Sequence, residues 1–122
     1  MKLLSVDDVY KIHETVINSN ELQGFAGGKS LDSVLSRVEN RIRYGMINDV
    51  FDLASTYAVV IAVGHVFCDA NKRTAFETMD ICLRENGITL KYETQLFGDI
   101  IIRVAQGLVD EVELSQVLRN LT

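Results

Sequence analysis

Apolar side chains recur every three or four residues along most of the chain, which is the spacing that places them on one face of an α-helix. This pattern predicts six helices separated by connectors that contain glycine or asparagine. Their expected ranges are about residues 5–17, 30–44, 48–64, 72–86, 94–106 and 110–121. We therefore expect a compact all-α bundle that forms a single domain over residues 1–122.

The predicted elements differ in how clearly their sequences define them. The first and the last begin with capping-box-like sequences, Ser5 to Asp8 and Asp110 to Glu113. The third is apolar on nearly every side from Tyr57 to Val63, which predicts the central, most buried helix. The glycine-bearing connector at residues 18–29 is either an ordinary loop or a mobile flap over a site. Residues 87–92 form either a short strand or an extended connector.

The composition narrows the classes of function. The formal net charge is −5, whereas a protein that binds nucleic acid directly needs clustered cations to displace counterions. The N-terminus turns acidic at Asp7 and Asp8 before a signal-peptide core can form, and the longest apolar stretch is far too short for a bilayer. Cys68 and Cys82 lie outside any zinc-binding spacing. We expect a cytoplasmic protein with reduced thiols and no membrane partner.

The segment between the third and fourth predicted helices reads His65-Val66-Phe67-Cys68-Asp69-Ala70-Asn71-Lys72-Arg73. Its fixed identities would arise by chance on the order of once in a million chains. Taken singly, His65 suits a helix end, Asp69 or Asn71 a helix cap, and the two cations a solvated pair. Together, an imidazole, a carboxylate, an amide and two cations favour chemistry on a phosphate.

The expected position of this segment supports that interpretation. The first turn of a helix presents unpaired backbone N–H groups to an anion, and residues 69–72 would form such a turn, with Ala70 inside it. Lys72 and Arg73 would add positive charge, and the Asn71 amide would hold one phosphate oxygen. A magnesium ion would bridge Asp69 and the phosphates, and His65 would take a proton from an attacking hydroxyl.

Three other residues are expected to take no direct part in the chemistry. Phe67 is expected to point inward and to hold the segment against the core. Cys68 is expected to have no chemical role. His13, in the first predicted helix, is expected on the surface.

The pattern His65-x-Phe67-x-Asp69-Ala70-Asn71-Lys72-Arg73-Thr74 resembles the signature of the Fic/Doc family, and within it the death-on-curing toxins of toxin–antitoxin modules. Chain length, helix order, the glycine-bearing connector and the helix ending at residues 84–87 are similar as well. The resemblance implies a Fic-type all-α fold with His65 as general base. It also implies Asp69 as the Mg²⁺ ligand, with Asn71, Lys72 and Arg73 binding the phosphates of ATP.

Two positions depart from the wider family, in which the product is an AMP-modified protein. Lys72 stands where most members carry glycine, and Phe76 stands where they carry a second arginine. Death-on-curing toxins share the lysine, so the resemblance implies a kinase that transfers the γ-phosphate to a threonine of elongation factor Tu and halts translation. AMP transfer to a protein hydroxyl remains an alternative, as does a catalytically inactive module that only binds an antitoxin.

Many Fic proteins carry an inhibitory helix that reads Ser/Thr-x-x-x-Glu-Gly/Asn. Here Leu35 precedes Glu39-Asn40 and Ile81 precedes Glu85-Asn86, so neither segment matches. The resemblance therefore implies restraint by a separate antitoxin of the prevents-host-death (Phd) type. Such antitoxins fold on binding, typically as an amphipathic helix in an apolar groove.

Overall fold

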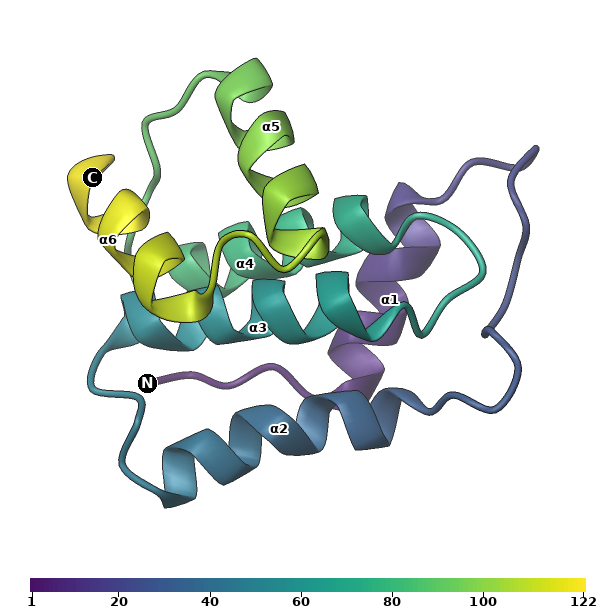
Figure 1. The fold of residues 1–122 in the computed structure, drawn as a ribbon, viewed down its shortest axis with the longest axis horizontal. Coiled ribbons are helices and arrows are strands. Elements are labelled where there is room, and N and C mark those ends of the chain that lie inside the picture. Colours follow the sequence, from purple (N-terminus) through teal and green to yellow (C-terminus); the bar gives the residue numbers. More distant parts are fainter.

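The computed structural model describes residues 1–122, with the exception of the side chain of Thr94. In the described chain six helices follow one another (Figure 1): α1 (Val6–Val16), α2 (Leu31–Arg43), α3 (Val50–Gly64), α4 (Asn71–Glu85), α5 (Thr94–Ala105) and α6 (Glu111–Asn120). Every predicted helix is present near its expected position, and the all-α class is confirmed. No helix of the described chain combines the length and apolarity needed to cross a membrane.

Local hydrogen bonds explain where three of the helices begin. Ser5 accepts a hydrogen bond from the backbone N–H of Asp8, and the Asp8 carboxylate accepts one from the Ser5 N–H in return. Asp110 and Glu113 make the same reciprocal pair at α6. Asp49 caps α3 by accepting from Asp52. These side chains satisfy backbone donors that the first helical turn leaves unpaired.

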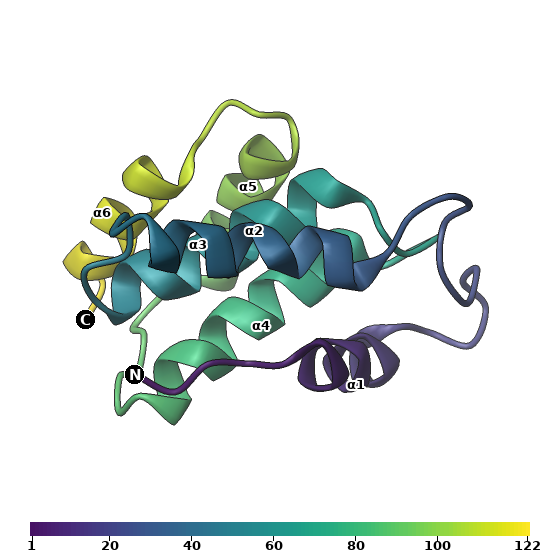
Figure 2. The same cartoon turned by 90° about the horizontal axis from the view of Figure 1, so that it is seen from below.

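The core is organised around α3 and α4. Figure 1 shows the two helices side by side at the centre, with α2 along one side of α3 and with α5 and α6 on the other side. In Figure 2, α1 lies below α4, which it contacts. The buried apolar cluster draws side chains from all six helices, and α3 contributes a nearly continuous buried stretch over residues 53–62. The prediction that α3 is the central helix is confirmed.

The C-terminal third differs from the sequence-based expectation in one side chain. The apolar spacing of the predicted helix over residues 94–106 places Leu96 in the core together with Phe97 and Ile101. In the structure Leu96 is 44% exposed, whereas Phe97 and Ile101 are buried. Phe97, Ile101 and Val104 recur at the helical spacing and share the inner face, so Leu96, one residue away from Phe97, points elsewhere. Residues 88–93 form an irregular connector rather than a strand, and this connector buries Leu90.

Candidate active site

The motif loop, residues 65–70, joins the end of α3 to the start of α4. It begins and ends with a non-glycine residue in the left-handed conformation, His65 at φ 47° and Ala70 at φ 66°. For residues with a β-carbon this conformation costs roughly 1–2 kcal/mol. The surrounding contacts must therefore hold the loop in place.

The amide side chain of Asn71 forms the first of these contacts. Its Oδ1 accepts from the backbone N–H of Phe67 at 3.0 Å, and its Nδ2 donates to the Phe67 carbonyl at 2.8 Å. Phe67 itself points inward and is 2% exposed, as predicted. The Asn71 side chain thus makes two bonds to the loop, and the second hydrogen on its Nδ2 is still available to a phosphate oxygen.

The connector at residues 18–29 packs against the other edge of the motif loop. The Cys68 N–H donates to the Gly24 carbonyl at 3.0 Å, and the Ala26 N–H donates to the Val66 carbonyl at 2.8 Å. These two bonds form an isolated antiparallel bridge centred on Phe67. Gly24 adopts a φ of +85°, which only glycine accepts readily. The connector is therefore anchored beside the candidate site, because its backbone pairs with the loop that carries the candidate chemistry.

Asp69 is held twice. Its Oδ2 accepts from the Leu22 N–H in the connector at 2.9 Å, and its backbone carbonyl lies 2.9 Å from Nε2 of His13 in α1. The other carboxylate oxygen, Oδ1, accepts no hydrogen bond from the described residues. Within the described chain, His, Cys, Asp and Glu side chains do not gather in groups of three or more that would make a complete metal site. A lone carboxylate suits Mg²⁺ only where substrate phosphates supply further ligands.

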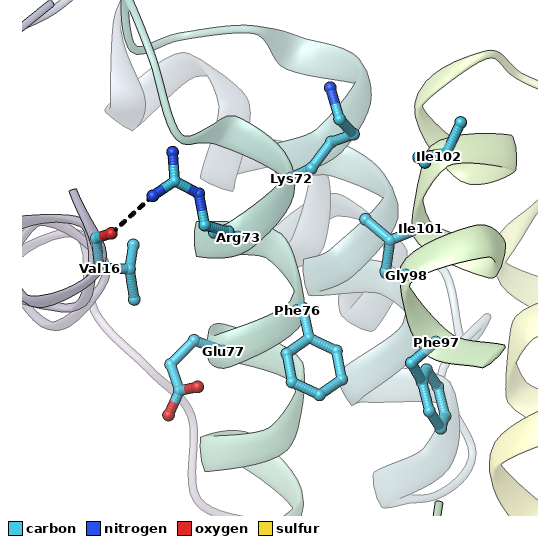
Figure 3. Close-up of a pocket in the computed structure, with 9 residues that line it drawn as sticks. All are labelled: Val16, Lys72, Arg73, Phe76, Glu77, Phe97, Gly98, Ile101 and Ile102. Atoms are coloured by element: carbon cyan, nitrogen blue, oxygen red, sulfur yellow. Dashed lines mark hydrogen bonds between the residues drawn. The ribbon is translucent and has the colours of Figure 1, made fainter. Parts of the chain in front are cut away.

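Arg73 reaches back toward α1, as Figure 3 shows. Its guanidinium donates to the Val16 carbonyl at 3.0 Å and forms an ion pair with Glu21 of the connector. The hydrogen bond from Arg73 holds the pKa of the Glu21 carboxyl below its ordinary value. Arg73 therefore joins α4 to the end of α1, and the donors it does not use there remain available to an anion.

The start of α4 is open. Its N-cap residue, Ala70, has no side-chain oxygen, and no described side chain caps the helix in its place. Lys72, in the first turn, is exposed and makes neither a hydrogen bond nor an ion pair with the described residues. An uncapped first turn next to a lysine is favourable for an anion, because both the N–H groups and the helix dipole attract negative charge. His65 is exposed at the opposite end of the motif loop.

His13 corrects a prediction. It was expected on the surface, but its side chain is 1% exposed and its ring lies parallel to Phe67, with 3.6 Å between ring centroids. The spacing contained a signal, because His13 stands four residues after Val9 and three before Val16, on the apolar face of α1. Its partners, Phe67 and Asp69, are remote in sequence, and only the folded chain brings them together.

Beside the open end of α4 lies a cavity of about 400 Å³ between α1, α4 and α5 (Figure 3). Lys72 and Arg73 stand at one edge, and Phe76 packs against Phe97 in the lining, with 5.6 Å between ring centroids. The lining consists of Val16, Lys72, Arg73, Phe76, Glu77, Phe97, Gly98, Ile101 and Ile102. It is an apolar recess with a basic margin.

Fold and loop together define an all-α protein whose candidate site is a basic, uncapped helix N-terminus. A sequence model of the Fic/DOC family matches residues 3–83, and the chain belongs to this family. It is 30% identical over 122 residues to "Protein kinase doc" of Escherichia phage P1, an alignment that covers 99% of this chain and 96% of that protein. The predicted family is thereby confirmed.

Proposed function

We propose that this chain is the toxin of a toxin–antitoxin module and acts as an ATP-dependent protein kinase in the cytoplasm. It transfers the γ-phosphate to a threonine hydroxyl of elongation factor Tu and so inhibits translation. The observation that carries the proposal is the uncapped first turn of α4 with exposed Lys72, next to the Asp69 carboxylate. The likeness to a phage protein named a kinase, over nearly the full length of both chains, supports phosphate transfer over AMP transfer.

The phosphates of ATP bind at the start of α4. The backbone N–H groups of Ala70 and Asn71 face the anion together with those of the next residues, and Lys72 and Arg73 neutralise its charge. Asn71 binds the phosphates through its backbone N–H and the second hydrogen of Nδ2, while its bonds to Phe67 shape the loop. Lys72 fills the space that a glycine would leave open, so the polyphosphate lies against a charge instead of against bare backbone.

Asp69 would hold a magnesium ion, and its Oδ1 is the carboxylate oxygen that the Leu22 N–H does not occupy. When bound, Mg²⁺ offsets the negative charge of the phosphates. The Leu22 N–H fixes the orientation of the carboxylate, so the connector takes part in shaping the site.

His65 supplies the base. The threonine oxygen attacks the γ-phosphorus, and the bond from that phosphorus to the β–γ bridging oxygen breaks. The hydroxyl proton passes to the His65 imidazole, and ADP leaves with the bridging oxygen. An exposed imidazole at the end of α3 suits this role, because a large protein substrate must reach it.

Incubation of the purified chain and elongation factor Tu with ATP labelled separately at the α- and γ-phosphates tests the proposal. Label retained on the target from the γ-position supports the kinase. Retention from the α-position identifies AMP transfer, and retention from neither position identifies a module that only binds a partner. His65→Ala should abolish labelling and toxicity while the circular dichroism spectrum stays unchanged. Cys68→Ser, in the same loop, is the matched control and should retain labelling.

We also propose that the recess between α1, α4 and α5 receives the antitoxin of the Phd type. Its apolar wall includes Phe97 and Ile101, and its margin carries Lys72 and Arg73. This combination fits an amphipathic segment that anchors an apolar side chain in the recess and places acidic side chains against the cations. Ile102, at 44% exposure, lines the recess, whereas Leu108, at 62%, lies outside it. Ile102→Arg should weaken antitoxin binding at least about tenfold, and Leu108→Arg should leave it unchanged.

A further inference from the structure

His13 makes two contacts with the motif loop, although it belongs to a helix outside the sequence motif. Its ring lies nearly parallel to Phe67, at an interplanar angle of 5°. Its Nε2 lies 2.9 Å from the backbone oxygen of Asp69. A carbonyl oxygen only accepts hydrogen bonds, so Nε2 carries the hydrogen and donates it. The buried Nδ1 has no hydrogen-bond partner among the described residues. Nε2 is therefore the one ring nitrogen of His13 that makes a hydrogen bond to the loop.

The Asp69 carbonyl belongs to a peptide unit that is held in an unfavourable backbone conformation. That unit links Asp69 to Ala70, and Ala70 adopts the left-handed φ of 66°. A peptide unit is planar, so its carbonyl and the N–H of the next residue turn together and point in opposite directions. Rotation of this plane by about half a turn would bring the φ of Ala70 to a negative value, which alanine prefers. The observed orientation therefore needs something to hold it.

The other hydrogen bonds around the loop do not hold the Asp69–Ala70 peptide plane, so His13 is the residue that fixes it. Thr74 holds the following carbonyl, that of Ala70, through its backbone N–H at 2.9 Å and its hydroxyl at 2.7 Å. Leu22 holds the Asp69 side chain, and Asn71 holds Phe67. Among the described residues only Nε2 of His13 bonds the Asp69 carbonyl. Loss of that bond would free the peptide to turn.

We propose that His13 is a positioning residue for phosphate transfer, which locks the Asp69–Ala70 peptide in the orientation that the site requires. The inference rests on the proposed function for what the loop does. With the carbonyl held by α1, the Ala70 N–H stays turned toward the bound phosphates, and the Asp69 carboxylate keeps its position at the entry to α4. His13 itself touches neither nucleotide nor target.

Three variants separate donation from ring stacking. His13→Phe keeps an aromatic ring against Phe67 but has no donor. His13→Gln lacks the ring but places an amide N–H near the position of Nε2. His13→Leu removes both the ring and the donor. It replaces His13→Phe in the measurements if the larger phenyl ring prevents folding. Val9→Ala, at a fully buried position of the same helix, is the matched control, because it creates a cavity without removing a hydrogen bond to the loop.

Amide hydrogen exchange measures the effect without reference to activity. The N–H groups of Leu22 and Cys68 report on the loop. The Leu22 N–H donates to the Asp69 carboxylate in the loop, and the Cys68 N–H donates from the loop to the Gly24 carbonyl. In His13→Phe these two amides should exchange about tenfold faster, the factor that corresponds to ~1.4 kcal/mol, relative to amides in α3. In His13→Gln they should stay within about threefold of the wild-type rates. Val9→Ala should speed exchange in α1 without singling out Leu22 and Cys68.

Turnover with labelled ATP provides the second measurement. His13→Phe should lower kcat about tenfold, with KM for the protein target unchanged, and His13→Gln should recover most of the loss. Unchanged exchange at Leu22 and Cys68 in His13→Phe would overturn the proposal, and so would an equal loss of kcat in Val9→Ala. A wild-type chain that transfers neither label contradicts the proposed function, and exchange alone then decides the role of His13.

Discussion

Replacement of Asn71 by alanine tests whether its amide organises the motif loop from within. The amide makes two hydrogen bonds, at 2.8 and 3.0 Å, and both go to the backbone of Phe67. No other described group bonds the Phe67 N–H or carbonyl, because the bridge to the connector uses the residues on either side, Val66 and Cys68. Asn71→Ala therefore leaves one donor and one acceptor of a buried residue without a protein partner.

The magnitude follows from those two bonds. A neutral hydrogen bond contributes about 1 kcal/mol net, and a buried group left unpaired costs about 1–3 kcal/mol. Asn71 is only half-buried, so water can reach the vacated position and soften the loss. We expect the free energy of unfolding to fall by about 2 kcal/mol, which lowers Tm by about 8 °C in a chain of this size.

Urea denaturation followed by circular dichroism provides the measurement. Lys72→Ala is the matched control, since Lys72 is the next residue, is exposed and has no bonded partner among the described residues. It should change the unfolding free energy by less than about 0.5 kcal/mol while it weakens ATP binding in calorimetry. An Asn71→Ala chain as stable as the wild type would refute the reasoning, because the amide would then contribute nothing to the loop.

Three further outcomes are expected. Because Arg73 lowers the pKa of Glu21, their ion pair persists below the ordinary glutamate range and is lost as pH falls through the lowered value; in Arg73→Ala, NMR titration should show the Glu21 pKa rise. A β-carbon at Gly64 would lie 2.9 Å from Cγ2 of Val34, so Gly64→Ala should cost about 1–3 kcal/mol, and adding Val34→Ala should cost less than the separate effects predict. Burial raises the pKa of Tyr57 to about 12, so absorbance titration should find it the last tyrosine to ionise, with folded-state stability lost as pH rises from about 10 toward that value.

The helical architecture is readable from the sequence because its signals are local. The capping boxes at Ser5 and Asp110 and the apolar run of α3 each lie within one element, so they predict that element without knowledge of its neighbours. The inward position of Phe67 is likewise a local expectation, because it rests on the large apolar side chain of that residue alone. Leu96 shows the limit, since a helix with apolar residues on several sides does not reveal which side the core will take.

The reactive side chains of the site can likewise be identified from the sequence, whereas their arrangement in space cannot. The imidazole of His65, the carboxylate of Asp69 and the cation of Lys72 can be read from the sequence, and their spacing places them in the motif loop and the first turn of α4. Two of the contacts that hold that loop come from far along the chain, because His13 in α1 and Leu22 in the connector both bind Asp69. Local periodicity carries no information on such contacts, because packing between distant segments decides them. The helices and the reactive groups can therefore be predicted from local sequence alone. Only the packing of the folded chain shows that Asn71 bonds the loop, that Arg73 pairs with Glu21, and that the buried His13 bonds the peptide at the start of α4.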